Sequence, residues 1–271
     1  MKYLCKTFLI FIIAFFTSCS TSSFFYAPSK EFVTYPDSIL FHIQEINFKA
    51  TNGKNINGWF LKPKDKEIIG TVLQLHGNAG NISSQYQFTE PLIKEGFQVM
   101  VFDYEGYGKS EGTPSQENVL DDAIQALRYI KQRDDVKNTK FILFGQSLGG
   151  HLACVVAAKE QQFIDALIIE GAFSGHETMA IYVSHKYAAP AWLARSLVPT
   201  KYDAIDYIDK ITIPKLIIHS TEDGTSPFYM SKELYSKAIE PKEFWEIKGA
   251  HIQAANLYTK EFVEHLKNSI K

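Results

Sequence analysis

The chain has 271 residues, of which 45% are hydrophobic, and its formal net charge is −2. This length and composition fit one globular domain with a short extension, and the mixed charges exclude a surface built to bind nucleic acid. Of the three cysteines, Cys5 and Cys19 lie near the N-terminus, so the body of the chain has no disulfide framework. We expect the remaining one, Cys154, to be buried on an apolar helix face.

The chain begins with a targeting segment. Two lysines precede the unbroken apolar run 8–16, which is too short to span a bilayer and is typical of a signal peptide. Small residues followed by Cys19 resemble a bacterial lipoprotein box, which implies a lipid on Cys19. We therefore expect a signal peptide over 1–18, a lipid-anchored tether over 19–40 and a membrane-anchored lipoprotein in the bacterial cell envelope. A plain cleaved signal peptide or an uncleaved anchor is the alternative.

Strand and helix patterns alternate through the rest of the chain. Runs 41–49 and 56–61 flank a turn-rich link and predict an antiparallel hairpin. Short continuous apolar runs, typical of strands buried on both faces, follow at 70–75, 97–102, 141–144, 166–169, 215–219 and 244–247. Helical patterns cover 115–131 (Ser115 as N-cap), 148–158, 228–238 and 254–270. The order predicts an α/β fold over 41–271, with a mostly parallel central sheet and helices on both faces.

The residues with the clearest chemistry form the sequence Gly-Gln-Ser-Leu-Gly at 145–149, with Ser147 at its centre. This sequence directly follows the predicted strand 141–144 and opens the predicted helix at Leu148. A strand-to-helix elbow exposes the serine hydroxyl above the sheet, and the flanking glycines leave room for the tight turn. Ser147 is therefore the candidate nucleophile, although a glycine-rich turn without chemistry has the same pattern.

A serine nucleophile needs a base and an acid, which in folds with such an elbow follow in the order serine, acid, histidine. His251 alone among the eight histidines follows the candidate acids and lies in a loop after a predicted strand. The acid is Asp223 or its neighbour Glu222, both in the loop after run 215–219. We expect His151 and His219 to be packed or hydrogen-bonded, and His176 and His185 to lie in exposed loops.

Backbone N–H groups should stabilise the oxyanion of the reaction. One donor is the residue after the nucleophile, Leu148, and the second comes from the loop after run 70–75. In that loop, His-Gly-Asn-Ala-Gly-Asn at 76–81, we choose the N–H of Asn78. His76 has no partners at metal-ligand spacing, and we interpret it as an orienting residue. We expect neither a metal nor a cofactor.

These motifs together resemble the α/β-hydrolase superfamily over almost all of the chain after residue 40. The segment 76–81 and Asp-Tyr-Glu-Gly-Tyr-Gly-Lys-Ser-Glu-Gly at 103–112 are similar to a subgroup that includes lipid-associated protein depalmitoylases and serine-aminopeptidase-like hydrolases. The family pattern around the acid, His-Gly-x-x-Asp-x-x-Val-Pro, favours Asp223 over Glu222. Glu105 stands where the subgroup usually has arginine. We interpret Asp103 as a buried aspartate that ties its loop.

The resemblance implies a serine esterase that cleaves carboxylic ester or thioester bonds of small-molecule or lipid-like substrates. Substrate choice should lie in a small cap insert at about 172–213. The insert is rich in aromatic and apolar residues, which suggests an acyl chain or another apolar group: Phe173, Met179, Tyr182, Tyr187, Trp192, Leu193 and Leu197. The same residues could instead cover the sheet as ordinary core.

Two other functions remain open. An aminopeptidase of the same fold would need an acidic subsite for a free amino group, which Glu105, Glu170 or Glu222 could supply. A catalytically silent binding lipoprotein is the second. Silent members of this fold usually lose a residue of the triad, whereas this chain keeps Ser147, Asp223 and His251.

Overall fold

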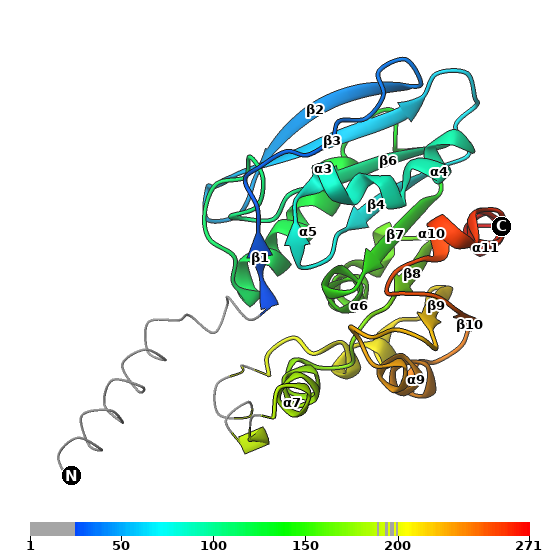
Figure 1. Cartoon of the computed structure of the whole chain (residues 1–271). Helices are drawn as coiled ribbons and strands as arrows, with labels where there is room; N and C mark the ends of the chain where they lie inside the picture. Colours follow the sequence, from blue (N-terminus) through cyan, green and yellow to red (C-terminus); the bar gives the residue numbers. More distant parts are fainter. Residues whose placement is uncertain (1–24, 189, 193–194, 196–197, 199) are drawn as a thin grey trace, which may run out of the picture.

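A computed structural model gives the fold and describes residues 25–188, 190–192, 195, 198 and 200–271. An eight-stranded twisted sheet forms its centre, in the order β10-β9-β8-β7-β4-β6-β3-β2 (Figure 1). β2 (Phe41–Lys49) and β3 (Asn55–Pro63) form the predicted antiparallel hairpin, and β3 also pairs antiparallel with β6. The other pairings in this sheet are parallel. The predicted α/β class is confirmed.

The parallel strands are short and mostly buried, as their continuous apolar runs predict. Each predicted run coincides with an observed strand to within two residues at either end. The strands are β4 (Gly70–Leu75), β6 (Phe97–Phe102), β7 (Phe141–Gln146), β8 (Ala166–Glu170), β9 (Lys215–Ser220) and β10 (Lys242–Ile247). β7 lies between β4 and β8, so the loops after these three strands meet at one edge of the sheet.

Helices cover both faces of the sheet, and each face has its own apolar cluster. One face packs against α5 (Gln116–Lys131), α6 (Leu148–Glu160) and α9 (Phe228–Lys237). The other packs against α3 (Ile82–Gln85), α4 (Glu90–Lys94), α10 (Ala254–Leu257) and α11 (Thr259–Ser269). Ser115 caps α5 as predicted, accepting a 3.1 Å hydrogen bond from the N–H of Asn118.

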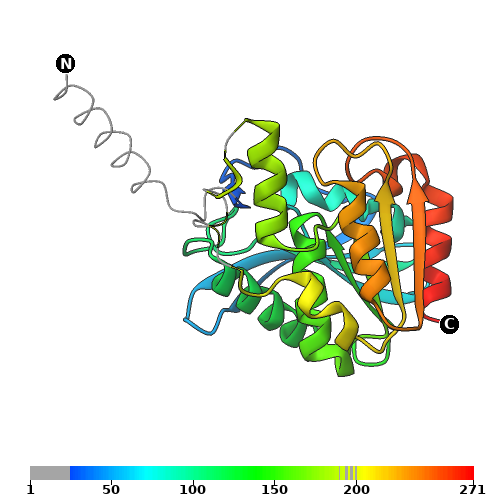
Figure 2. The same ribbon diagram turned by 90° about the horizontal axis from the view of Figure 1, so that it is seen from below.

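The helix expected over 254–270 is in fact two helices, because Tyr258 leaves the helical conformation at φ −127° and ψ 38°. Its hydroxyl bonds to the main chain of Lys248, which holds the break in place. In the insert between β8 and β9, α7 (His176–Lys186) stands beside the described start of the chain (Figure 2). None of the helices in the described part of the chain is long and apolar enough to cross a bilayer.

Residues 25–40, expected from the sequence to belong to the tether, lie along the folded domain. Phe25 and Tyr26 are buried, and β1 (Ala27–Pro28) pairs with β5 (Ala79–Gly80) in a small parallel sheet. The domain therefore includes the chain from Phe25 onward, because its first aromatic side chains are part of the core. The expected signal peptide and the predicted lipid site Cys19 lie outside the described residues.

Candidate active site

Ser147 lies at a sharp turn between β7 and α6. Its backbone has φ 54° and ψ −118°, a region that side-chain-bearing residues rarely adopt. Its N–H donates to the carbonyl of Glu170 at 2.8 Å, and its own carbonyl accepts the N–H of His151. The strain is therefore held by the neighbouring strand and the following helix. This is the elbow that the sequence predicts.

The two motif glycines are required by close packing around this turn. A Cβ on Gly145 would lie 2.3 Å from the carbonyl oxygen of Gly149, and a Cβ on Gly149 would lie 1.9 Å from that of Leu75. No side chain fits at either distance. The glycines thus let α6 approach β4 and β7 closely, which brings the start of α6 over the carboxyl ends of both strands.

His251 and Asp223 form a short, oriented pair. His251 Nδ1 and Asp223 Oδ2 are 2.6 Å apart, and the aspartate side chain is 1% exposed. Burial opposes ionisation, but hydrogen bonds from His219 and His251 outweigh it and hold the pKa of Asp223 well below its usual range. The other carboxylate oxygen accepts the N–H groups of Thr225 and Ser226. An ionised Asp223 therefore keeps the proton of His251 on Nδ1 and leaves Nε2 as an acceptor.

Glu222, the neighbouring acid, is placed differently. It is exposed, and its Oε2 accepts the N–H of Gly249 at 3.0 Å. Its carboxylate supports the loop that carries His251 but is bonded to the main chain and not to the imidazole. Residue type and position allowed either acid, and Asp223 is the one whose carboxylate contacts His251.

Ser147 and His251 both lie against the end of β8. The N–H of Ser147 bonds to Glu170, and the ring of His251 lies over the next residue, Gly171, where a Cβ would be 2.9 Å from Cε1 of the ring. The Ser147–His251 hydrogen bond itself is not formed, since His251 Nε2 is buried and has no partner among the described residues. Catalytic hydrogen bonds often tighten only when substrate is bound.

The predicted oxyanion donors lie on the two sides of Ser147. Leu148 is the first residue of α6, where backbone N–H groups have no partner within the helix. Asn78 belongs to the loop after β4, in which Gly77 approaches Ser147 so closely that a Cβ on it would be 3.7 Å from the serine Cβ. Burial lowers the pKa of His76 to about 4, so the neutral ring can donate from Nδ1 to the Gly77 carbonyl, 2.7 Å away.

A chain of buried polar side chains runs beneath the site. Gln74, Gln146 and Glu170 lie at or next to the ends of three adjacent strands. Gln74 donates to Gln146 and Gln146 to Glu170, each at 2.9 Å. The other oxygen of Glu170 accepts the N–H of Ala254 at 2.7 Å. Burial raises the pKa of Glu170, although the hydrogen bonds from Gln146 and Ala254 lower it in part. The network links the strand before Ser147 to the loop that carries His251. In the sequence, the feature that could have indicated it is a polar residue near the end of each of three apolar strands.

Glu105, which stands where the resembled subgroup usually has arginine, has a local structural role. Its buried carboxylate accepts hydrogen bonds from Asn52 at 2.6 Å and Asn118 at 3.1 Å, and a Cβ on Gly112 would collide with it at 2.0 Å. Glu105 therefore closes its own loop from within. Asp103 acts as expected from the sequence, since its Oδ1 accepts the N–H of Ile82 at 2.8 Å and ties the loop to α3.

One group of described residues has the chemistry of metal ligands: His151, His176 and Asp203, whose ligand atoms lie within 4.8 Å of one another. His176 is buried in α7 and bonds to Asp203 at 2.6 Å, so its expected place in an exposed loop is wrong. The two nitrogens of His151 lie 3.0 Å and 3.1 Å from main-chain carbonyls. Burial lowers the pKa of His151 to about 3, so the neutral ring has one N–H and can donate to one of these carbonyls. The group joins α6 to the cap insert.

The aromatic residues of the insert fall into two classes. Phe173 is buried, and Met179 and Tyr182 are half-buried against the same core. Tyr187 and Trp192 are exposed by 74% and 67%. The first three are core residues, whereas the last two give the cap an exposed apolar surface. Leu193 and Leu197 lie outside the described residues.

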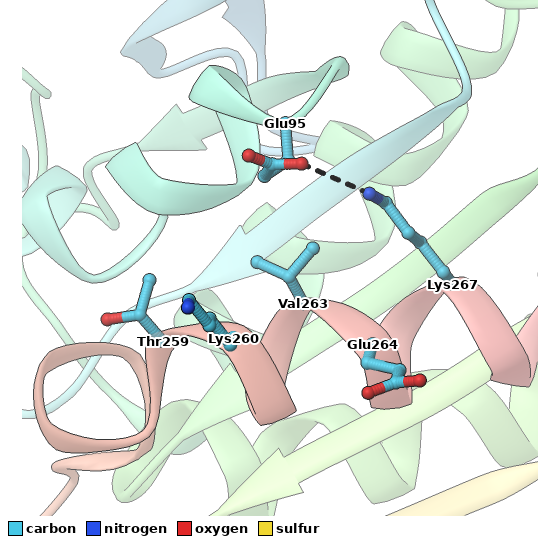
Figure 3. A pocket seen from close by; sticks show the side chains of 6 residues that line it. All are labelled: Glu95, Thr259, Lys260, Val263, Glu264 and Lys267. Carbon is cyan, nitrogen blue, oxygen red and sulfur yellow. Dashed lines mark hydrogen bonds and ion pairs between the residues drawn. The ribbon is translucent and has the colours of Figure 1, made fainter.

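A shallow pocket elsewhere on the molecule has no catalytic arrangement. It lies along α11 (Figure 3), where Glu95 and Lys267 are bridged at 3.2 Å. Its lining is a mixture of opposite charges and small apolar surface: Glu95, Thr259, Lys260, Val263, Glu264 and Lys267. None of the candidate catalytic residues lines it.

Solved structures with a similar fold include esterases. The esterase Pf2001 of Pyrococcus furiosus superposes with a TM-score of 0.74 at 19% identity, covering 91% of this chain and 97% of that protein. Est1E of Butyrivibrio proteoclasticus, solved with ferulic acid bound, gives a TM-score of 0.66 at 21% identity, covering 83% and 99%. At these identities the likeness shows the fold.

Similar sequences extend over almost the whole chain. Residues 70–194 match the family model of the alpha/beta hydrolase fold. The "Uncharacterized protein YfhR" of Escherichia coli strain K12 is 32% identical over 278 residues, covering 97% of this chain and 94% of that protein. The "Alpha/beta hydrolase domain-containing protein WAV2" of Arabidopsis thaliana is 28% identical over 219 residues, covering 78% and 71%. The chain therefore belongs to the α/β-hydrolase superfamily and, within it, to the family of the YfhR proteins.

Proposed function

We propose that the protein is a serine hydrolase that cleaves carboxylic ester or thioester bonds through an acyl-enzyme on Ser147. The observation that carries the proposal is the strained elbow of Ser147 beside the His251–Asp223 pair, which is 2.6 Å apart. Backbone strain at a serine is retained only where the surroundings enforce it, and such strain clusters at active sites. The esterases among the fold neighbours support the same reaction class.

In the proposed mechanism, Ser147 Oγ attacks the acyl carbon while His251 Nε2 takes the hydroxyl proton. Asp223 holds the ring orientation and stabilises the imidazolium. The N–H groups of Asn78 and Leu148 bind the oxyanion, and each such donor typically lowers the barrier by about 3–4 kcal/mol. His251 then returns the proton to the leaving alcohol or thiol. Water repeats the sequence on the acyl-enzyme and releases the acid.

Apolar acyl groups are the substrate class that the cap favours. Tyr187 and Trp192 expose large aromatic surface on the insert, which lies between the strand before Gly171 and the strand before Asp223. Such surface binds acyl chains or other apolar groups better than charged ones. A series of p-nitrophenyl esters of increasing chain length tests this, with rising kcat/KM expected from acetate to medium chains. A flat series would contradict the apolar preference.

The aminopeptidase alternative is less well supported. It requires a free acidic side chain for the substrate amino group, but Glu105 and Glu170 are buried and accept hydrogen bonds at both carboxylate oxygens. Glu222 is exposed, yet it accepts the N–H of Gly249. Aminoacyl anilides should therefore be poor substrates beside the esters. A preference for anilides would overturn the proposed substrate class.

The nucleophile is tested with a fluorophosphonate probe, which labels activated serines. We expect stoichiometric labelling of the wild type, none at this site in Ser147→Ala, and full labelling in Ser236→Ala, which removes an exposed serine of α9. Wild-type protein that hydrolyses no ester and takes no label would favour a binding lipoprotein. Unchanged labelling of Ser147→Ala would contradict the assigned nucleophile.

We also propose that Cys19 is lipid-modified and anchors the enzyme to the bacterial cell envelope. The support is the sequence alone, an apolar run followed by small residues and a cysteine. Several acyl chains on one cysteine are enough for stable anchoring, where one chain is marginal. Cys19→Ala should move the protein from the membrane to the soluble fraction, whereas Cys154→Ala should not. Membrane association unchanged by Cys19→Ala would contradict this anchor.

A further inference from the structure

The first described residues of the chain, 25–35, form an N-terminal strap beside the candidate oxyanion loop. The strap pairs with the loop through main-chain bonds of 2.9 Å, from the N–H of Ala27 to the Asn78 carbonyl and from that of Ser29 to the Gly80 carbonyl. The side chain of Asn81 returns two bonds to strap carbonyls, at 3.1 Å and 2.7 Å. The loop is thus held along its length by a segment about fifty residues earlier in the sequence.

The contacts converge on Asn78, the candidate oxyanion donor. Its carbonyl accepts both the N–H of Ala27 and the hydroxyl of Tyr107, at 2.9 Å and 2.7 Å. The peptide on its other side is held through the Gly77 carbonyl, 2.7 Å from His76 Nδ1. In a trans peptide the N–H points opposite to the C=O, so this bond directs the Asn78 N–H away from His76. Both peptides that flank Asn78 are therefore fixed.

The strap is itself fixed at both of its ends. Near its start the ring of Phe25 lies edge-on to His176 of α7 at 4.9 Å, and the side chain is 7% exposed. Farther along, Phe32 and Tyr35 pack with Trp59 of β3, at ring distances of 5.8 Å and 5.7 Å. A segment anchored on both sides of Ala27 can hold a loop in place.

We propose that Ala27 is a positioning residue of the active site, which bonds through its N–H to the Asn78 carbonyl and so fixes the backbone of Asn78, whose own N–H is the oxyanion donor. The inference rests on the proposed function, because it gives Asn78 a role only if an oxyanion forms there. Preorganised donors contribute to catalysis because they need no reorganisation when charge develops. A loop free to rotate at residue 78 would lose that advantage while still binding the ground-state ester. The strap thus affects kcat far more than KM.

The test compares Ala27→Pro, which has no N–H, with Ala27→Val, which keeps it and suits an extended strand. A second pair removes one hydroxyl each: Tyr107→Phe loses the bond to Asn78, and Tyr86→Phe loses a 3.1 Å bond to the strap at Tyr35. Steady-state kcat and KM for a p-nitrophenyl ester are measured in the full chain. Inhibition by a boronic acid, which mimics the tetrahedral intermediate, is measured alongside.

We expect Ala27→Pro and Tyr107→Phe each to lower kcat by about 10-fold, below the roughly 10²–10³-fold loss for deleting a donor, with KM unchanged within twofold. Boronic acid affinity should fall in parallel with kcat, and both controls should resemble wild type. A kcat of Ala27→Pro within twofold of Ala27→Val overturns the inference. Should Ala27→Pro fail to fold, Tyr107→Phe against Tyr86→Phe decides by the same criterion. Failure of the wild type to hydrolyse esters would instead refute the proposed function.

Discussion

Replacing Asp223 by asparagine probes the proposed charge arrangement most directly. The carboxylate is surrounded by donors: His251 at 2.6 Å and His219 at 3.3 Å on one oxygen, and the N–H groups of Thr225 and Ser226 at 2.8 Å and 2.9 Å on the other. An asparagine has one acceptor oxygen and one NH₂ group. If the oxygen keeps the two backbone N–H groups, which is the less costly choice, the NH₂ group faces His251 Nδ1.

That orientation determines the size of the effect. An NH₂ group at this position requires Nδ1 of His251 to accept, so the proton moves to Nε2 and the ring can no longer take the proton of Ser147. In a triad this change of tautomer costs about 10⁴-fold in kcat, which corresponds to about 5 kcal/mol of barrier. KM should change little, because no contact to the substrate is lost.

The assay is hydrolysis of a p-nitrophenyl ester, with circular dichroism to establish that the variant is folded. Glu222→Gln is the matched control, because the amide oxygen can still accept the N–H of Gly249 and the imidazole is untouched. We expect the control to keep nearly full activity. If Asp223→Asn retained more than a tenth of wild-type kcat, or Glu222→Gln lost more than Asp223→Asn, the assignment of the acid would be refuted.

Two further predictions follow from the geometry. Gly171→Ala should lower kcat/KM by about 10²-fold, the order expected when a catalytic group is displaced by 1 Å, because the new Cβ would lie 2.9 Å from the His251 ring at a φ of +62°. The control is Gly224→Ala, at a glycine with open space around it. Equal activity of the two variants would contradict the close contact between Gly171 and the His251 ring. Burial raises the pKa of Asp122 to about 8, with the Glu105 charge adding to it. A raised folded-state pKa gives stability that is complete below the unfolded value of about 3.9 and is lost as pH rises through about 8. The free energy of unfolding, measured in urea, should therefore fall less steeply between pH 5 and pH 9 in Asp122→Asn than in the wild type. An equal fall in both would contradict the raised pKa of Asp122.

The fold could be predicted because its signals are local. Strands buried on both faces have continuous apolar runs, and the elbow adds a serine between two glycines at the junction of strand and helix. The sequence could not decide between Asp223 and Glu222 from residue type, because both are carboxylates in one loop. The family pattern favours Asp223, and in the structure the side-chain directions separate the two: Asp223 accepts from the imidazole of His251 and Glu222 from a backbone N–H.

His176 shows a second limit of sequence reasoning. A lone histidine in an insert without strong periodicity suggests an exposed loop, but this residue is buried on α7 against the aromatic ring of Phe25. Its partner, Asp203, is 27 residues further along the chain and bonds to it at 2.6 Å. The environment of such a residue depends on which segments fold over it, and no local pattern reports that.

The two sides of the candidate site are supported by different kinds of contact, and this difference decides what a sequence can reveal. The base is held by side chains, with Asp223 on the ring of His251 and Glu170 on the N–H of Ala254, and such residue types are visible as buried or strand-end acids. The oxyanion loop is held by the Tyr107 hydroxyl and also by the backbone N–H groups of Ala27 and Ser29, donors that almost every residue type carries. A substitution scan that changes side chains alone would therefore find Tyr107 but pass over the support from Ala27. Proline, which removes the donor itself, is the substitution that exposes it.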